Sequence, residues 1–246
     1  MAIQVSSIDP PTQLTKREQR AAYLKALLGT LQANVPEAVA LTDLRAQAAA
    51  IVNEHTFPTT RDEDWRFTDL SAMLSVPFQA SQAFPEVDET ALAAIEMPEA
   101  IARIVLVNGQ FSAGLSDLGQ LPAGVVVGDL ATLKTGAMAD QLTARLAQSS
   151  GGHELFTALN TVGFQEAAVV WVPRHQVIEQ PIHVVYLSVD GGTPTVTSPR
   201  CLVVAETGSA LTLVEDFYGA QDHAQFYISV TEVWADENAQ VTHVRL

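Results

Sequence analysis

The last third of this 246-residue chain is the region that most limits what the whole can fold into. From residue 167 onward, short apolar runs alternate with clusters of turn-forming residues, and no helical pattern interrupts them. Such a series is typical of a β-sandwich, a β-barrel or a β-helix, and it argues against a doubly wound α/β sheet. We find no strict repeat of fixed period, so the sequence permits a β-helix without demonstrating one. The expected strands are Ala168–Val172, Gln176–Ile178, Ile182–Val189, Cys201–Ala205, Ala210–Val214, Gln225–Trp234 and Ala239–Leu246.

The first hundred residues follow a different pattern, because their apolar residues recur at helical spacing. Thr15 and Glu18 form a capping box, in which each side chain satisfies a backbone amide of the other residue. The apolar face that follows consists of Leu24, Leu27, Leu28 and Leu31. A second helix is expected to begin at Pro36 and to run antiparallel to the first.

A charged and aromatic segment, Phe57–Leu70, comes after the two helices. Thr60 and Glu63 predict another capping box, and the acidic residues there suit the positive end of a short helix. Trp65 and Phe67 are candidates for burial.

Residues 75–165 mix loop, strand and helix signals. Three prolines before residue 100 indicate a loop around one short helix near Glu89–Glu96. Ile104–Val107 followed by Asn108 and Gly109 predicts a strand that ends in a tight turn. The other elements expected here are a strand at Val125–Val127 and helices at Ala137–Ala147 and Glu154–Asn160.

Charge and composition exclude several classes of protein. The chain carries 13 Lys+Arg against 28 Asp+Glu, a net charge of −15, so nucleic acid and anionic membranes would repel it. Apolar residues make up 48% of the chain, enough for a substantial core. The single cysteine rules out an internal disulfide framework and a Cys-rich metal site made by this chain alone. No apolar run approaches the roughly 18 residues of a membrane helix, and no secretory signal is apparent, so we expect a cytoplasmic protein.

Common catalytic motifs are missing from the sequence. Neither the P-loop nor the glycine-rich dinucleotide fingerprint occurs, and HExxH, GxSxG and CxxC are also absent. His183 alternates with Val185 and Leu187, so we interpret it as a hydrogen-bonded interior residue. Cys201 shares a strand face with Val203, and we interpret it as a small buried hydrophobic residue.

The adjacent carboxylates Glu215 and Asp216 suggest the acid pair of a glycosidase. Neighbours on a strand point to opposite faces, however, so these two cannot flank one bond. We interpret Trp171, Tyr218 and Trp234 as core or rim aromatics rather than a sugar-binding platform. The residues by themselves therefore assign no catalytic constellation.

Several segments, taken together, resemble a known family. Phe57–Leu70 resembles the Pro–Arg–Glu–Trp–Lys/Arg–aromatic–Thr stretch of the SufB/SufD family of iron–sulfur cluster assembly proteins, and it is most similar to SufD. Further similar segments follow in the family's order over residues 57–243. They are Val107–Ser112 with Leu115 and Ser116, Phe156–Asn160, Gln180–Ile182, Pro199 and Arg200, Leu213–Glu215, and Asn238–His243.

The resemblance implies an α+β, mainly β fold. It implies an N-terminal helical region at residues 1–100, a mixed α/β lead-in segment at residues 101–165, and the start of a right-handed parallel β-helix core at residues 166–246. It further implies that the β-helix is truncated before its C-terminal end.

The resemblance also implies a role. The chain would be a non-enzymatic scaffold subunit of the SUF iron–sulfur cluster assembly complex, paired with a SufB-like subunit and driven by the SufC ATPase. Family members continue through more β-helix into a C-terminal helical domain that docks SufC, and the resemblance implies that this later part is missing here. The family's functional cysteine and histidine also fall in that later part. We therefore assign no catalytic, cofactor-binding or metal-binding residue here, and expect no cofactor to be stably bound by this chain alone, with the cluster handled by the complex.

Two other functions and one further assembly stay open. A carbohydrate-active β-helix enzyme would need two carboxylates converging on one face. A plain protein-interaction module would need neither a cluster nor an ATPase. A homodimer could form along the open strand edge near Leu246.

Overall fold

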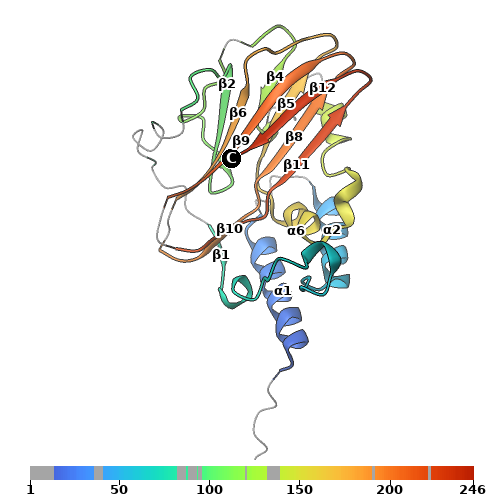
Figure 1. Ribbon diagram of the computed structural model, residues 1–246, viewed down its shortest axis with the longest axis vertical. Coiled ribbons are helices and arrows are strands. Elements are labelled where there is room, and N and C mark those ends of the chain that lie inside the picture. The colour runs from blue at the N-terminus through green and yellow to red at the C-terminus, as the bar shows by residue number, and fades with distance from the viewer. Residues whose placement is uncertain are drawn as a thin grey trace, which may run out of the picture.

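The computed structural model describes residues 14–35, 41–81, 87, 93, 96–119, 121–131, 139–189, 192–220 and 223–246. Figure 1 shows the long strands at one end of the molecule and the helices at the other. Within the described ranges, no helix is both long and apolar enough to cross a bilayer. The expected helix start at Pro36 and nearly all of the expected helix at Glu89–Glu96 lie outside the described residues.

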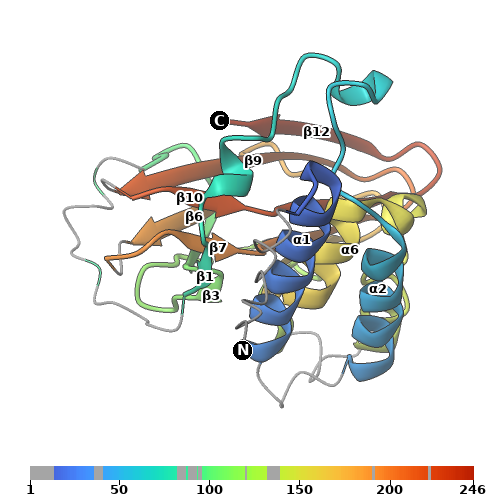
Figure 2. The same cartoon turned by 90° about the horizontal axis from the view of Figure 1, so that it is seen from below.

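Helices α1 (Lys16–Ala33), α2 (Thr42–Glu54) and α6 (Leu155–Gly163) pack together at the helical end. The predicted capping box at Thr15 and Glu18 is present, and the four predicted leucines are buried. Figure 2 shows α1 and α2 running antiparallel with α6 between them. The approach of α6 to α1 is close at Gly163, where an added Cβ would lie 2.8 Å from Cδ2 of Leu31.

The strands form three sheets whose neighbours are mostly parallel. The first sheet has the order β11-β8-β5-β4, the second β12-β9-β6-β2-β3, and the third β1-β7-β10. Only β3 and β4 are antiparallel to their described neighbours, β2 and β5. The strands of the first sheet are β4 (Val126–Gly128), β5 (Ala167–Val172), β8 (Arg200–Ala205) and β11 (Val230–Ala235). Those of the second are β2 (Ala102–Val107), β3 (Gln110–Phe111), β6 (Ile182–Val189), β9 (Ala210–Ala220) and β12 (Gln240–Arg245). Those of the third are β1 (Gln79–Ala80), β7 (Thr195–Thr197) and β10 (Gln225–Tyr227).

The chain visits the three sheets in turn, and the last two rounds keep a constant register. Each residue of β10, β11 and β12 lies opposite the residue 30 positions earlier in β7, β8 and β9. The first partners in these ladders are Thr195 with Gln225, Arg200 with Val230, and Ala210 with Gln240. The corners repeat as well, because Gly208 and Asn238 both adopt left-handed backbone angles, with φ of 69° and 58°.

The main hydrophobic core lies between the first two sheets. Alternate side chains of β2, β5, β6, β8 and β9 fill it, among them Ile104, Val170 and Leu213 at 0% exposure. The outer faces of both sheets carry hydrophobic clusters of their own, one around Trp171 and the other around Val185. Burial on both faces explains why these strands read as continuous apolar runs rather than alternating ones.

Shorter elements connect these layers. The predicted turn at Asn108 and Gly109 forms the hairpin between β2 and β3, with both residues at positive φ. The predicted helix at Ala137–Ala147 is represented by α5 (Ala139–Thr143), which ends before Ala147, a residue with a left-handed φ of 58°. The one-turn 3₁₀ helices are η1 (Glu63–Trp65), η2 (Met73–Ser75) and η3 (Ser150–His153).

Two of the predicted strands are wrong in detail. The run Gln225–Trp234 is two strands, β10 and β11, because the chain turns a corner at Ile228, whose side chain packs into the helical cluster. Gln176–Ile178 makes one isolated bridge, from Val177 to Ala210, and forms no strand. The left-handed backbone of His175, at a φ of 59°, breaks the extended conformation there.

The segment Phe57–Leu70 also departs from prediction. The predicted capping box of Thr60 and Glu63 is wrong, since the Asp62 carboxylate instead accepts hydrogen bonds from the amide and hydroxyl of Thr59. Phe67 is not buried but 89% exposed, because the turn after η1 sends it away from Trp65.

The predicted α+β class, with helices first and strands after, is confirmed. Parallel pairing dominates, as expected for the strand-rich core. The three sheets are separate hydrogen-bonded ladders. By themselves they do not establish the predicted right-handed β-helix.

Candidate functional site

One polar feature of the interior is centred on Glu215, whose side chain is fully buried on β9. Strand alternation places Glu215 on the same face as Leu213, so its carboxylate points into the main core. A buried carboxylate is costly unless hydrogen bonds and countercharges surround it. The neighbouring strands supply these partners.

Three side chains bind the Glu215 carboxylate, and we call the four residues the Glu215 cluster. The Tyr186 hydroxyl donates to Oε1 at 2.7 Å, and the Thr231 hydroxyl donates to Oε2 at 2.7 Å. Nε2 of His243 lies 2.5 Å from the same Oε2. Arg245 adds a positive charge 3.8 Å away. The cluster therefore ties β6, β9, β11 and β12 together through one carboxylate.

Cys201 lies on β8 in the core that the cluster enters, and it is fully buried. Burial, followed by the negative charge of Glu215, raises the pKa of the Cys201 thiol well above its usual range. Burial likewise raises the pKa of Tyr186. Both groups are thus neutral at physiological pH, and the interpretation of Cys201 as a buried hydrophobic residue is confirmed.

Asp216 points to the opposite face of β9 from Glu215, as predicted. There its Oδ2 lies 3.2 Å from Nε2 of His183 and accepts a hydrogen bond from Tyr218 at 3.3 Å. His183 is 1% exposed, and burial lowers its pKa despite the nearby Asp216. The interpretation of His183 as a hydrogen-bonded interior residue is confirmed, and the two adjacent carboxylates do not converge on one bond.

A second buried ionic network joins the helices to the strands. Nε of Arg200 donates to Oε1 of Glu232 at 2.7 Å, and both side chains are almost fully buried. Nη1 of Arg200 also donates to Oδ1 of Asn160 at 2.7 Å, and Asn160 donates onward to the carbonyls of Pro199 and Ile228. Two segments singled out in the sequence, Phe156–Asn160 and Pro199 with Arg200, therefore meet here in a structural role.

The aromatic residues divide between core and rim. Trp171 is 1% exposed beneath the guanidinium of Arg145, and Tyr218 and Trp234 are partly buried at cluster edges. Trp65 packs against Phe156 with ring centroids 5.2 Å apart. The interpretation of these rings as core or rim aromatics agrees with these positions.

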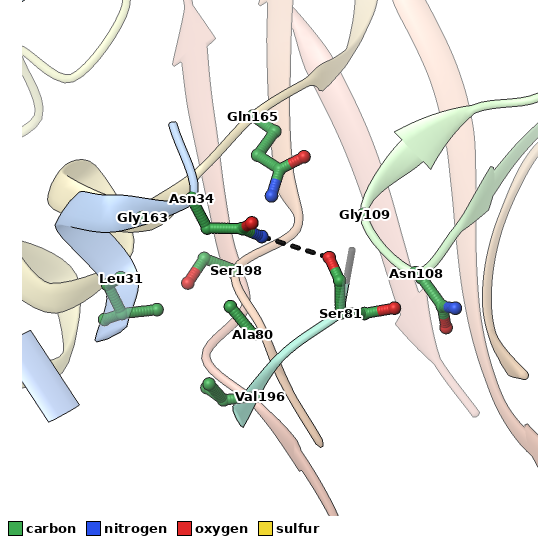
Figure 3. Close-up of a pocket in the computed structure, with 10 residues that line it drawn as sticks. All are labelled: Leu31, Asn34, Ala80, Ser81, Asn108, Gly109, Gly163, Gln165, Val196 and Ser198. Atoms are coloured by element: carbon green, nitrogen blue, oxygen red, sulfur yellow. Dashed lines mark hydrogen bonds between the residues drawn. The ribbon is translucent and has the colours of Figure 1, made fainter. Parts of the chain in front are cut away.

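A small pocket lies where α1, α6 and the hairpin at Asn108 converge (Figure 3). Asn34 donates to the carbonyl of Ser81 at 3.0 Å along its wall. The buried Ser198 hydroxyl, also on the wall, has no hydrogen-bond partner among the described residues. The space is about 10 Å³, close to what one water molecule needs, so the pocket suits a water rather than a substrate.

No group of three or more His, Cys, Asp or Glu side chains in the described part of the chain is arranged to hold a metal ion. Sequence reasoning placed His183, Cys201 and the two carboxylates correctly. It did not find the Glu215 cluster or the Arg200–Glu232 pair, because their partners lie 16 to 32 residues apart and meet only across parallel strands.

Comparison with known proteins agrees with the family resemblance of the segments between residues 57 and 243. Residues 24–184 match the family described as SufBD protein N-terminal region, and residues 187–246 match the SUF system FeS cluster assembly SufBD core domain. The chain is 34% identical over 247 residues to an iron–sulfur cluster assembly SufBD family protein of Synechocystis sp., covering 96% of this chain and 54% of that protein. It is 27% identical over 231 residues to the chloroplastic protein ABCI7 of Arabidopsis thaliana, covering 89% of this chain and 46% of that protein.

The chain spans about half the length of these curated relatives. Two family matches nonetheless account for nearly all of the sequence from residue 24 to residue 246. The residues, the order of the segments and the matches agree: the chain belongs to the SufB/SufD family of iron–sulfur cluster assembly proteins.

Proposed function

We propose that this chain is a SufD-like, non-enzymatic scaffold subunit of the SUF iron–sulfur cluster assembly complex. It pairs with a SufB-like subunit, and the SufC ATPase drives the pair. The observation that carries the proposal is the succession of family matches over residues 24–184 and 187–246. The buried networks around Arg200 and Glu215 support it, because they lock strands and helices into one stiff body suited to side-by-side assembly.

We also propose that the three sheets are the first rounds of a right-handed parallel β-helix. The 30-residue register of the last two rounds supports this, as do the matching left-handed corners at Gly208 and Asn238. Such a stack of repeats offers a long, extended surface to a partner. An experimental structure would show the handedness directly, and a left-handed path or a closed barrel would refute it.

The chain alone is proposed to bind no cluster stably, and iron and sulfur are cargo that the complex handles. The buried, neutral Cys201 thiol supports this, because metal ligation needs an accessible thiolate. Iron analysis of anaerobically purified chain should give far less than one iron per molecule. A stoichiometric iron content would refute this part of the proposal.

Co-purification tests the assembly role. The natural protein that contains this chain, carrying an affinity tag, should retain a SufB-like subunit and an ATPase with a P-loop through a moderate salt wash. A tagged protein of similar size and charge serves as the control. Failure to retain any P-loop ATPase, with the tagged protein folded, would contradict the SUF assignment. The cytoplasmic location expected from the sequence stays a prediction.

A rival carbohydrate-active role has no support in the site, since Glu215 and Asp216 lie on opposite faces of β9. The role of a plain interaction module is distinguished by the same co-purification, because it would retain a partner without the ATPase.

A further inference from the structure

The first turns of α1 lie between two hollows at the helical end of the molecule. The larger, about 700 Å³, is lined by Lys16, Arg17 and Arg20 from α1 and by Arg61 from the segment that follows α2. The smaller, about 450 Å³, is lined by Lys16, Gln19 and Arg20 together with Ser71, Leu74 and Ser75. Lys16 and Arg20 are one helical turn apart and so share both hollows. We call these four cations and the hollows between them the basic groove.

The basic groove is an exception to the charge of the chain. The sequence has 13 basic residues against 28 acidic ones, yet four of the basic residues gather here. Among the described residues that line the larger hollow, Asp62 is the one carboxylate. None of the four cations comes within 4.0 Å of a carboxylate in the part of the chain that the structure describes.

Two carboxylates whose charge interacts with Arg20, Asp62 and Asp69, are held by their own turns. The amide of Thr59 donates to Asp62 at 2.7 Å, and the Ser71 hydroxyl donates to Asp69 at 2.6 Å. These hydrogen bonds, with a smaller contribution from Arg20, lower the pKa of both aspartates. The two carboxylates therefore stay charged but are fixed in turns rather than placed on the cations.

Several arginines elsewhere in the molecule are held by specific contacts. Arg200 pairs with Glu232, and Arg45 donates to the carbonyl of Phe164 at 2.7 Å and lies over its ring. Arg145 donates to the carbonyl of Gln141 and lies over Trp171. Grouped cations without such contacts repel one another, and an anionic ligand would relieve that repulsion.

The surroundings favour a short peptide over a long polyanion. A net charge of −15 repels nucleic acid and anionic membranes as a whole, whereas a short acidic segment senses only charges within a Debye length of about 8 Å. Thr56, Thr59 and Thr60 add hydroxyls to the wall, and the buried ring of Phe57 forms an apolar floor. Figure 1 shows the first turns of α1 at the tip of the molecule, away from the long strands.

We propose that the basic groove docks a short acidic segment of a partner protein. Carboxylates of that segment bind Lys16 and Arg20 from both hollows, and Arg17 and Arg61 extend the contact. The proposal does not depend on the SUF role, because it rests on charge and shape at the helical end.

Fluorescence anisotropy with a fluorescein-labelled octaglutamate peptide tests this on the 246-residue chain. The wild-type chain should bind at low ionic strength and lose affinity as salt rises. The double variant Lys16→Glu/Arg20→Glu should weaken binding by about tenfold or more, because it replaces attraction with repulsion at the centre of the groove. A Lys16→Ala/Arg20→Ala variant should give a smaller loss and covers the case in which the glutamates disturb folding.

The matched control is Lys25→Glu/Arg174→Glu, which changes the net charge equally at exposed positions outside both hollows. It should bind the peptide as the wild type does. The proposal is overturned if the wild-type chain ignores octaglutamate, if the control loses as much affinity as the groove variant, or if RNA or anionic vesicles bind the groove and octaglutamate does not. Binding that appears only after residues 1–13 are removed would also overturn it, since the chain's own segment would then be the occupant.

Discussion

Charged residues have opposite roles at the strand end and at the helical end of this molecule. In the strand layers, Arg200 and Glu215 are fully buried, and each of the two has close polar partners. At the helical end, Lys16 and Arg20 face open hollows and lack close carboxylate partners among the described residues. The comparison teaches that charge fixes the structure where it is desolvated and stays available for binding where it is not.

The largest expected effect on folding comes from changing the 30-residue repeat at the strand end. Duplicating residues 200–229 adds one full round in register, so the chain should still unfold cooperatively. Duplicating residues 200–214 adds half a round and should prevent stable folding, because the second sheet would lose its parallel partners. Circular dichroism and thermal melting of both chains check this. Equal behaviour of the two insertions would show that the 30-residue register carries no structural meaning.

Breaking the buried ion pair comes next. Arg200→Ala should cost about 3–5 kcal/mol of unfolding free energy, because it leaves Glu232 buried and unpaired. Urea denaturation measures the change. Lys25→Ala, at an exposed position on α1, is the matched control and should leave the midpoint unchanged. A loss below about 1 kcal/mol for Arg200→Ala would mean that water already reaches the pair.

Two phenylalanines of the same segment sharpen the comparison within the helical end. Phe57 is 1% exposed and Phe67 is 89% exposed. Phe57→Ala should destabilise the fold by about 3–5 kcal/mol, whereas Phe67→Ala should stay within about 0.5 kcal/mol of wild type. Differential scanning calorimetry of the two variants checks the order, and a reversal would place Phe67 in a packed environment.

The smallest expected effect is a pH dependence at the strand end. Burial holds the pKa of His183 below its ordinary value of 6.5, so the unfolded chain takes up a proton before the folded chain does. Stability should therefore fall as pH drops through about 6.5 and level off below the lowered pKa of the folded state. Asp216 moderates the shift, and Arg103 adds to it. His183→Gln should flatten this part of the stability curve, and an unchanged slope would assign it to other groups.

Sequence patterns predicted elements best where one local rule decides them. The capping box at Thr15, the leucine face of α1 and the turn at Asn108 all depend on residues within a few positions of one another, and all are present. The strand β7 was not predicted, because Thr195–Thr197 lies among prolines and serines that read as a loop.

The 30-residue repeat is present in the sequence, but too few of its positions carry identical residues to give a strict period. Four identities lie 30 positions apart along β8, β9, β11 and β12, and inspection of the register makes them visible. They are Val203 with Val233, Ala205 with Ala235, Thr212 with Thr242, and Val214 with Val244. Buried partners such as Glu215 and His243 could not be predicted, because only the pairing of parallel strands brings them together.

The most direct test of the account is native mass spectrometry of this chain mixed with a SufB-like subunit. We predict a complex of one copy of each at low micromolar concentration, and the exposed-site variant Lys25→Glu should form it as the wild type does. Two separate subunits at every concentration, with both proteins folded, would contradict the proposal that this chain is a scaffold of the SUF complex.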